Sequence, residues 1–333
     1  MDIAKRCKQN PILRPSDLQP CIKGMEISCL LNPGVFRYGN RIGLVLRVAE
    51  RPLQQEGKIS FPVYDNGRFK VLEFDKDDPE LNASDPRVIN YRGTDYLTTL
   101  SYLRFVWSDD GVHFREDPEY PPIFGSRPLE SFGIEDCRVA TMKDGYFLTF
   151  TEVSPVAVGV GLMQTTDFRH FSHKGMIFPP HNKDCALFED KIGDMYYAFH
   201  RPSSPELGGN YIWIAESPDR VHWGNHRCLG GPPIKTDKGW LEIYHGADAS
   251  NCYRLGALLL DADQPWKVLA RTTSPIMEPT ASYEKNGFFG NVVFTDGSVV
   301  DGDRITLYYG ASDEVICSAE LSVKEILNAL ETC

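Results

Sequence analysis

The chain repeats one local pattern five times, and this repetition constrains the fold more than any other feature of the sequence. Each copy has a polar residue, an apolar stretch, a glycine-containing turn and a second stretch rich in Tyr, Phe and Leu. Glycine supplies the positive φ angles that tight hairpin turns need, so each copy predicts a β-hairpin. The copies occupy residues 32–47, 136–152, 184–201, 232–245 and 291–310.

A second motif alternates with the hairpins and sets the period. It reads Ser or Thr, then Asp, then an aromatic residue, and its aspartates are Asp109, Asp167 and Asp219, which lie 58 and 52 residues apart. A period of about 50 residues with four strands per unit is typical of propeller blades. We therefore predict an all-β fold, a five-bladed β-propeller forming one domain over residues 1–333. A Greek-key sandwich is the alternative, but it does not account for the long period.

The other segments are placed around the predicted ring. Alternating residues in 53–75 predict strands that complete the first blade, and the polar stretch 76–95 predicts a surface loop. Apolar residues at helical spacing predict a short C-terminal helix over 321–332.

Charge and composition exclude several classes of protein. The net charge is −11 and no basic run is present, which opposes nucleic-acid binding. No apolar run approaches the roughly 18 to 20 residues of a membrane helix. The N-terminus lacks the apolar core of a secretory signal, so we expect a cytoplasmic protein, or a periplasmic one if a signal peptide has been removed. Nine scattered cysteines predict reduced thiols, and eight histidines without ligand spacing predict no metal site and no cofactor.

Polar residues recur where the predicted hairpins begin and end, and in a propeller these positions converge on one mouth of the central channel. Such a mouth, with carboxylates, basic groups, amides and aromatic walls, suits a carbohydrate. The alternative for any single residue is a bond to a neighbouring loop, and for the recurring aspartates it is turn capping. The candidates are Asn32, Asp136, Asp184 and Asn291 at hairpin starts, and Arg47, Glu152, His200, Arg201, Tyr244, His245 and Asp313 at second-strand ends.

Several motifs, taken in order, resemble glycoside hydrolase family 130, the β-mannoside phosphorylases and mannosidases. They are LLNPGVF, FGIEDCRV, FPPHNKDCALF, YYAFHRP, GWLEIYHGAD, NVVF and YYGASDEVICSA. The resemblance implies a five-bladed β-propeller, with Asp136 as the general acid that acts through the 3-hydroxyl of the bound mannose. It also implies a sugar subsite formed by Asn32, Arg47, one of Asp109 and Asp110, Lys183, Asp184 and Asp313.

This family contains both hydrolases and phosphorylases. A phosphorylase needs basic groups for phosphate, whereas an inverting hydrolase needs a carboxylate that deprotonates water. Glu206 and Glu242 resemble the glutamate pair of the β-1,2-mannosidases, and Glu242 shares a strand face with Trp240 and Tyr244. Phe288 stands where many phosphorylases have an acidic residue, and the segment before Gly230 is short, through either a true deletion or a missing loop.

We therefore predict an inverting, exo-acting β-mannosidase for β-1,2-linked mannosides, in which Glu242 or Glu206 activates water. The alternative is a β-mannosyl phosphorylase with inorganic phosphate as co-substrate, which releases mannose 1-phosphate. A non-catalytic sugar-binding propeller is a third reading, but it does not require Asp136 together with both glutamates. The expected partner is a mannose-containing oligosaccharide. Oligomeric state stays open, with self-association favoured by the resemblance and by the terminal helix.

Overall fold

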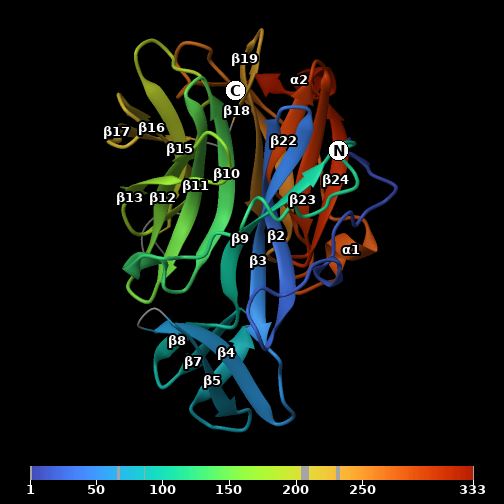
Figure 1. Ribbon diagram of the computed structural model, residues 1–333. Helices are drawn as coiled ribbons and strands as arrows, with labels where there is room; N and C mark the ends of the chain where they lie inside the picture. The colour runs from blue at the N-terminus through green and yellow to red at the C-terminus, as the bar shows by residue number, and fades with distance from the viewer. Residues whose placement is uncertain (1, 66–67, 86, 204–209, 230–232, 333) are drawn as a thin grey trace.

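The computed structural model describes residues 2–65, 68–85, 87–203, 210–229 and 233–332, and these residues form an all-β protein (Figure 1). Five antiparallel sheets make up the main body, and each consists largely of strands that are consecutive in the sequence. Each predicted hairpin contributes an antiparallel pair to a different sheet, so the prediction of five hairpins is confirmed.

The strands of the five sheets have the following bounds. The first sheet contains β2 (Met25–Tyr38), β3 (Arg41–Pro52) and β9 (Leu100–Ser108). The second contains β10 (Ile134–Met142), β11 (Gly145–Ser154), β12 (Ala157–Thr165) and β13 (Ser172–Phe178). The third contains β14 (Asn182–Leu187), β15 (Tyr196–Pro202), β16 (Ile212–Ser217) and β17 (Gly224–Leu229).

The last two sheets include strands from the two ends of the chain. The fourth contains β18 (Pro233–Thr236), β19 (Gly239–Ala247), β20 (Tyr253–Leu260), β21 (Val268–Arg271) and the C-terminal β25 (Glu331–Thr332). The fifth contains β22 (Val293–Asp301), β23 (Arg304–Ala311), β24 (Val315–Ser322) and the N-terminal β1 (Lys5–Arg6). Because β1 pairs with β24, the N-terminal segment is held on the last sheet of the chain.

Hydrophobic cores lie between the sheets. One cluster joins Phe36 of the first sheet to Phe150 of the second, and the next joins Phe147 of the second to Ala198 of the third. Further clusters join the third sheet to the fourth, the fourth to the fifth, and the fifth to the first. Burial of these aromatic and aliphatic faces supplies the main favourable contribution to folding.

Residues 58–97 differ from the prediction. They form two small sheets that project from the main body at the bottom of Figure 1, one of β4 (Lys58–Asp65) and β5 (Arg68–Asp75), the other of β6 (Leu81–Asp85), β7 (Val88–Tyr91) and β8 (Thr94–Leu97). The prediction that 53–75 completes the first blade is therefore wrong, as is the surface loop over 76–95. The alternation over 53–75 did predict the strands β4 and β5, but not that they form a separate sheet. The strands β6, β7 and β8 bury little surface apart from Ile89, so their polar composition resembled that of a loop.

Helical structure is sparse among the described residues. The C-terminal helix is α2 (Val323–Ala329), whose first turn is capped by the Ser322 hydroxyl accepting from the Glu325 amide. It is shorter than the predicted 321–332, because β24 extends through Ser322 and residues 331–332 form β25. The others are α1 (Ser282–Lys285) and the 3₁₀ turns Pro15–Asp17 and Pro128–Glu130. None of the described helices is long and apolar enough to span a bilayer.

Candidate active site

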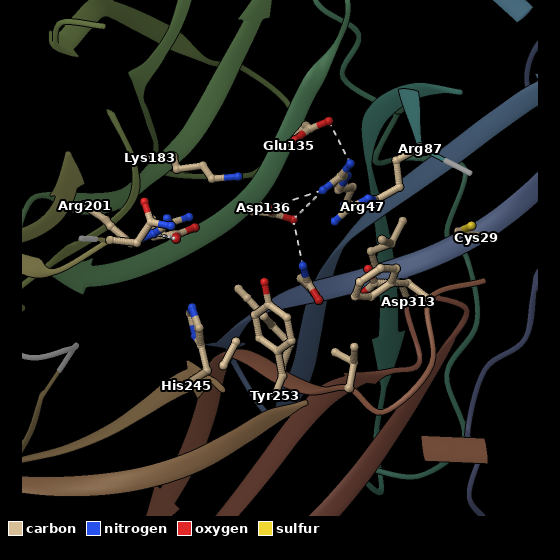
Figure 2. A pocket seen from close by; sticks show the side chains of 18 of the residues that line it. Cys29, Arg47, Arg87, Glu135, Asp136, Lys183, Arg201, His245, Tyr253 and Asp313 are labelled. Carbon is tan, nitrogen blue, oxygen red and sulfur yellow. Dashed lines mark hydrogen bonds and ion pairs between the residues drawn. The ribbon is translucent and has the colours of Figure 1, made fainter. Parts of the chain in front are cut away.

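A cavity of about 770 Å³ opens at the inner ends of the sheets, and most of the predicted site residues line it (Figure 2). Every sheet of the main body contributes side chains, and the inserted β7–β8 hairpin adds a further wall. The predicted residues at this pocket are Asn32, Arg47, Asp136, Lys183, Asp184, Arg201, Tyr244, His245 and Asp313.

An unusual backbone conformation aims three of these side chains into the pocket. Asn32, Asp136 and Asp184 have positive φ angles of 32°, 46° and 55°. Each also lies at a register shift in the first hairpin of its sheet. A β-bulge redirects the side chain of the extra residue, and left-handed backbone at a non-glycine residue is strained. A bulge with a positive φ angle occurs in each of the three sheets, which explains why these polar side chains meet in one pocket.

Arg47 of β3 contacts side chains of two other strands, β9 and β10. Its Nη1 atom lies 3.1 Å from Oδ1 of Asp136, its Nη2 atom 2.7 Å from Oε1 of Glu135, and its Nε atom donates to the Ser101 hydroxyl at 3.0 Å. The Asn32 amide also donates to Oδ1 of Asp136, at 3.0 Å. Because these donors are fixed by different strands, the Asp136 carboxylate is held in one orientation.

The two adjacent carboxyls differ in acidity. Burial opposes ionisation of Asp136, but the Arg47 guanidinium and the Asn32 hydrogen bond outweigh it, so the pKa of Asp136 lies below its ordinary value. Burial raises the pKa of Glu135, and the neighbouring negative charges of Asp136 and Asp184 reinforce that rise. The pair therefore favours one charge on Asp136 in the free protein.

Three basic residues, Lys183, Arg201 and His245, form what we term the basic wall. Figure 2 shows them on the opposite side of Asp136 from Arg47 and Asp313. Arg201 donates to Asp184 at 2.5 Å, whereas Lys183 is the pocket cation that has no carboxylate partner among the described residues. Burial lowers the pKa of His245 to about 4, so its imidazole is neutral at pH 7.

Asp313 stands on the Arg47 side of the pocket. Burial and the charge of Asp136 raise the pKa of its carboxyl to about 6, although Arg47 acts in the opposite direction. Arg87, from the inserted sheets, stacks over Phe289 with its guanidinium carbon 4.5 Å from the ring centre. This side of the pocket thus combines carboxylate, guanidinium and aromatic groups, which are suited to hydroxyls and ring faces of a sugar.

Asp109 and Asp110 do not belong to the pocket, so the prediction that one of them holds the sugar is wrong. Oδ1 of Asp110 accepts the backbone N–H groups of Val112 and His113, and its Oδ2 pairs with the His113 ring at 2.7 Å. Asp109 is exposed beside Arg115. The repeat at Asp167 and Asp219 makes the same bonds to the backbone, so these aspartates cap turns at the surface.

Two other predicted residues are buried away from the pocket surface. His200 lies in the core, where it stacks on Phe178 and contacts His226 at 3.0 Å. Glu242 is fully buried, does not line the pocket, and has no hydrogen-bond partner in the described part of the chain. Burial raises its pKa well above the ordinary value, which opposes the role of a base that activates water. Glu206 lies outside the described residues.

The pocket contains residues that the sequence did not single out. Glu135 and Arg138 adjoin Asp136 in the FGIEDCRV motif, which was the available signal for both. Arg87 carried no such signal, because it lies in the segment predicted to be a loop.

A concave pocket with a buried carboxyl held by an arginine and an asparagine amide, a basic wall and an aromatic wall is typical of a carbohydrate-active enzyme. A family model described as beta-1,4-mannooligosaccharide phosphorylase matches residues 86–332. The chain therefore belongs to glycoside hydrolase family 130, as the motifs indicated.

Four curated relatives with 31% to 42% identity to the chain are named phosphorylases. The chain is 42% identical to a β-1,2-mannobiose phosphorylase of Listeria innocua, over 98% of both chains. It is 35% identical to a 1,2-β-oligomannan phosphorylase of Thermoanaerobacter, over 79% of this chain and 89% of that one. A solved structure of the Listeria innocua enzyme with β-1,2-mannobiose superposes with a TM-score of 0.94 at 40% identity, covering 98% of this chain and 99% of that one.

These relatives overturn the prediction of a hydrolytic β-mannosidase. That prediction depended on Glu206 and Glu242 as the base, but Glu242 is sealed beneath the pocket and Glu206 is not described. It also used the departure at Phe288, which stands where many phosphorylases have an acidic residue. Phe288 lines the pocket and packs on the apolar patch of Cys29, Leu31 and Ala49. The basic wall comes from two sheets, so no single segment of the sequence reveals it.

Proposed function

We propose that this protein is a β-1,2-mannobiose phosphorylase, which cleaves a β-1,2-mannoside with inorganic phosphate and releases α-mannose 1-phosphate and mannose. The observation that carries this proposal is the basic wall beside Asp136. Among the described residues Lys183 has no carboxylate partner, and Arg201 and His245 line the same pocket. Phosphate binding needs such clustered donors, and hydrolysis does not. The similarity to phosphorylases over the whole chain supports the same assignment.

In the proposed complex, the mannose unit whose bond is broken lies between Asn32, Arg47 and Asp313, with phosphate on the basic wall. The amide and carboxylate oxygens of Asn32 and Asp313 accept hydrogen bonds from sugar hydroxyls, and Arg47 donates to a sugar oxygen. Asp136 lies between the basic wall and Arg47 (Figure 2), and therefore between the two proposed subsites. This arrangement would place a phosphate oxygen and the departing sugar on opposite faces of the anomeric carbon, as an inverting reaction requires.

The proposed reaction is balanced by one proton transfer. A phosphate oxygen forms a bond to the anomeric carbon while the glycosidic C–O bond breaks, and the departing oxygen takes a proton that originates from Asp136. The resemblance to the family implies that this proton passes through the 3-hydroxyl of the mannose. The Asp136 carboxylate then regains a proton from solvent, and no further cofactor takes part in the proposed reaction.

Phosphate binding would also raise the pKa of Asp136. In the free protein Arg47 and Asn32 favour the ionised form of Asp136. A bound phosphate adds negative charge beside this carboxylate, and like charges in a buried site favour the protonated form. The proton needed for bond cleavage would therefore be taken up when the co-substrate binds.

We further propose that the five sheets are the blades of a five-bladed propeller. Support comes from the five hydrophobic clusters, because each one joins two sheets that follow each other and the last joins the fifth sheet to the first. Each sheet also supplies residues to the same pocket. The pocket would then be the mouth of the central channel.

The test is an incubation of the purified protein with β-1,2-mannobiose and, separately, with β-1,4-mannobiose, with and without inorganic phosphate. We expect consumption of the β-1,2-linked substrate only when phosphate is present. Equal consumption without phosphate would refute phosphorolysis, and a preference for the β-1,4-linked substrate would refute the assigned linkage.

A further inference from the structure

A row of alternating charges at the pocket joins residues from three sheets of the main body. Arg138 of β10 lies at the pocket floor, with its Nη2 atom 2.6 Å from Oδ1 of Asp296 and its Nη1 atom 3.7 Å from Oδ1 of Asp184. The other carboxylate oxygen of Asp184, Oδ2, accepts the hydrogen bond from Nε of Arg201. The row therefore runs Asp296, Arg138, Asp184, Arg201 and ends in the basic wall.

Asp296 occupies the buried end of this row. Its side chain is 0% exposed and it does not line the pocket, so it cannot touch a substrate there. It lies at a register shift in β22, between Thr295 and Gly297. A carboxyl in such a place is costly unless it has a partner. Burial raises the pKa of Asp296 well above its ordinary value, and the Arg138 guanidinium, its ion-pair partner at 2.6 Å in the described structure, opposes that rise and favours the ionised form.

Removal of the Asp296 charge would alter the other contacts of Arg138. Asp184 lies 3.7 Å from Arg138 and has one oxygen engaged with Arg201. Without Asp296, the guanidinium of Arg138 would be balanced mainly by Asp184, because Glu242 forms no hydrogen bond among the described residues and no ion pair with Arg138. Arg138 would then compete with Arg201 for the Asp184 carboxylate, and Arg201 would lose its fixed orientation.

We propose that Asp296 is a positioning residue for phosphate binding: by holding Arg138 it leaves Asp184 free to orient Arg201 in the basic wall. This inference rests on the proposed phosphorolysis, since it assigns Arg201 to the phosphate subsite. Asp296 touches neither substrate, because it does not line the pocket.

The test uses Asp296→Asn, which keeps the shape of the side chain and removes its charge. Phosphate binding is measured by calorimetry, and phosphorolysis is measured with phosphate and β-1,2-mannobiose varied separately. We expect the Kd and the KM for phosphate to rise about tenfold, and the KM for mannobiose to stay within about twofold. An unchanged Kd for phosphate, or a parallel rise of both KM values, would overturn the proposal.

A double-mutant cycle separates positioning from general damage. In an Arg201→Gln background, Asp296→Asn should weaken phosphate binding no further, whereas additive losses would show that Asp296 does not act through Arg201. Glu50→Gln is the matched control, because Glu50 is an equally buried carboxyl that is bound by the Cys21 amide and the Tyr102 hydroxyl instead. Its KM for phosphate should match the wild type. If Asp296→Asn does not fold, Asp296→Ser removes the same charge and the same outcomes apply.

Calorimetry distinguishes the failure of this inference from the failure of the proposed function. A wild-type protein that binds phosphate but yields no mannose 1-phosphate would refute phosphorolysis, while the Kd of the variant would still decide the role of Asp296. A wild-type protein that binds no phosphate would refute both.

Discussion

Asp313→Asn should make the protein more stable and less active. The carboxyl of Asp313 has its pKa raised from 3.8 to about 6 by burial and by the charge of Asp136. An acid whose pKa is raised in the folded state binds more protons there than in the unfolded chain, so its contribution to stability is greatest below pH 3.8 and is lost as the pH rises to about 6. Above that pH the Asp313 carboxylate is ionised in the folded protein, and this buried charge lowers the free energy of unfolding by its full amount.

The size of the effect follows from the two pKa values. The gap between 3.8 and about 6 corresponds to a cost of about 3 kcal/mol at pH 8, of which about half is already present at pH 5. Solvent in the pocket screens part of this cost, so we expect Asp313→Asn to raise the free energy of unfolding by about 1 to 3 kcal/mol at pH 8, and by less at pH 5. Turnover should fall, because the amide replaces an acceptor in the proposed sugar subsite.

Urea denaturation at the two pH values measures this directly. Asp303→Asn is a control of opposite sign, because bonds from the Lys324 amide and the Ser322 hydroxyl lower the pKa of this exposed carboxylate. Its substitution should destabilise the protein, more at pH 8 than at acidic pH. A loss of stability in Asp313→Asn at pH 8, or a gain that is the same at both pH values, would refute the reasoning.

Three further substitutions test the site. Asp136→Asn should lower kcat roughly a hundredfold to ten-thousandfold while the protein stays folded, and full activity in a phosphorolysis assay would remove it as the acid. Lys183→Gln should raise the KM for phosphate about tenfold and leave the KM for mannobiose within about twofold, as separate substrate titrations would reveal. Gly34→Ala would place a Cβ atom 2.4 Å from the Cys137 carbonyl oxygen. It should lower the free energy of unfolding by about 1 to 3 kcal/mol in urea melts and reduce kcat, because it separates the strands that carry Asn32 and Asp136; wild-type stability would contradict this contact.

The sequence predicted the hairpins because their signals are local. A turn glycine such as Gly145, with a φ of 129°, and the alternation on either side of it are enough to define the pair of β10 and β11. In the inserted sheets, the alternation over 53–75 predicted strands where β4 and β5 lie but not their separate sheet, and β6, β7 and β8 had no such signal. These three strands expose polar side chains such as Asn82 and Asp95, which a strand and a loop carry equally well.

The site was predictable only in part, for a similar reason. Asn32, Asp136 and Asp184 share a position in the repeat, so their convergence followed from the predicted architecture. For Glu242, alternation along β19 gives the face of the strand but not how deep that face lies between sheets, and the residue is sealed below the pocket. The basic wall comes from two sheets, and neither its composition nor its proximity to Asp136 can be read from one segment.

The most direct test of the central claim is a ³¹P and ¹H NMR time course of the protein with β-1,2-mannobiose and inorganic phosphate. The account predicts that the phosphate signal declines as α-mannose 1-phosphate and mannose appear in equal amounts. An unchanged phosphate signal, with two molecules of free mannose formed from each disaccharide, would contradict it.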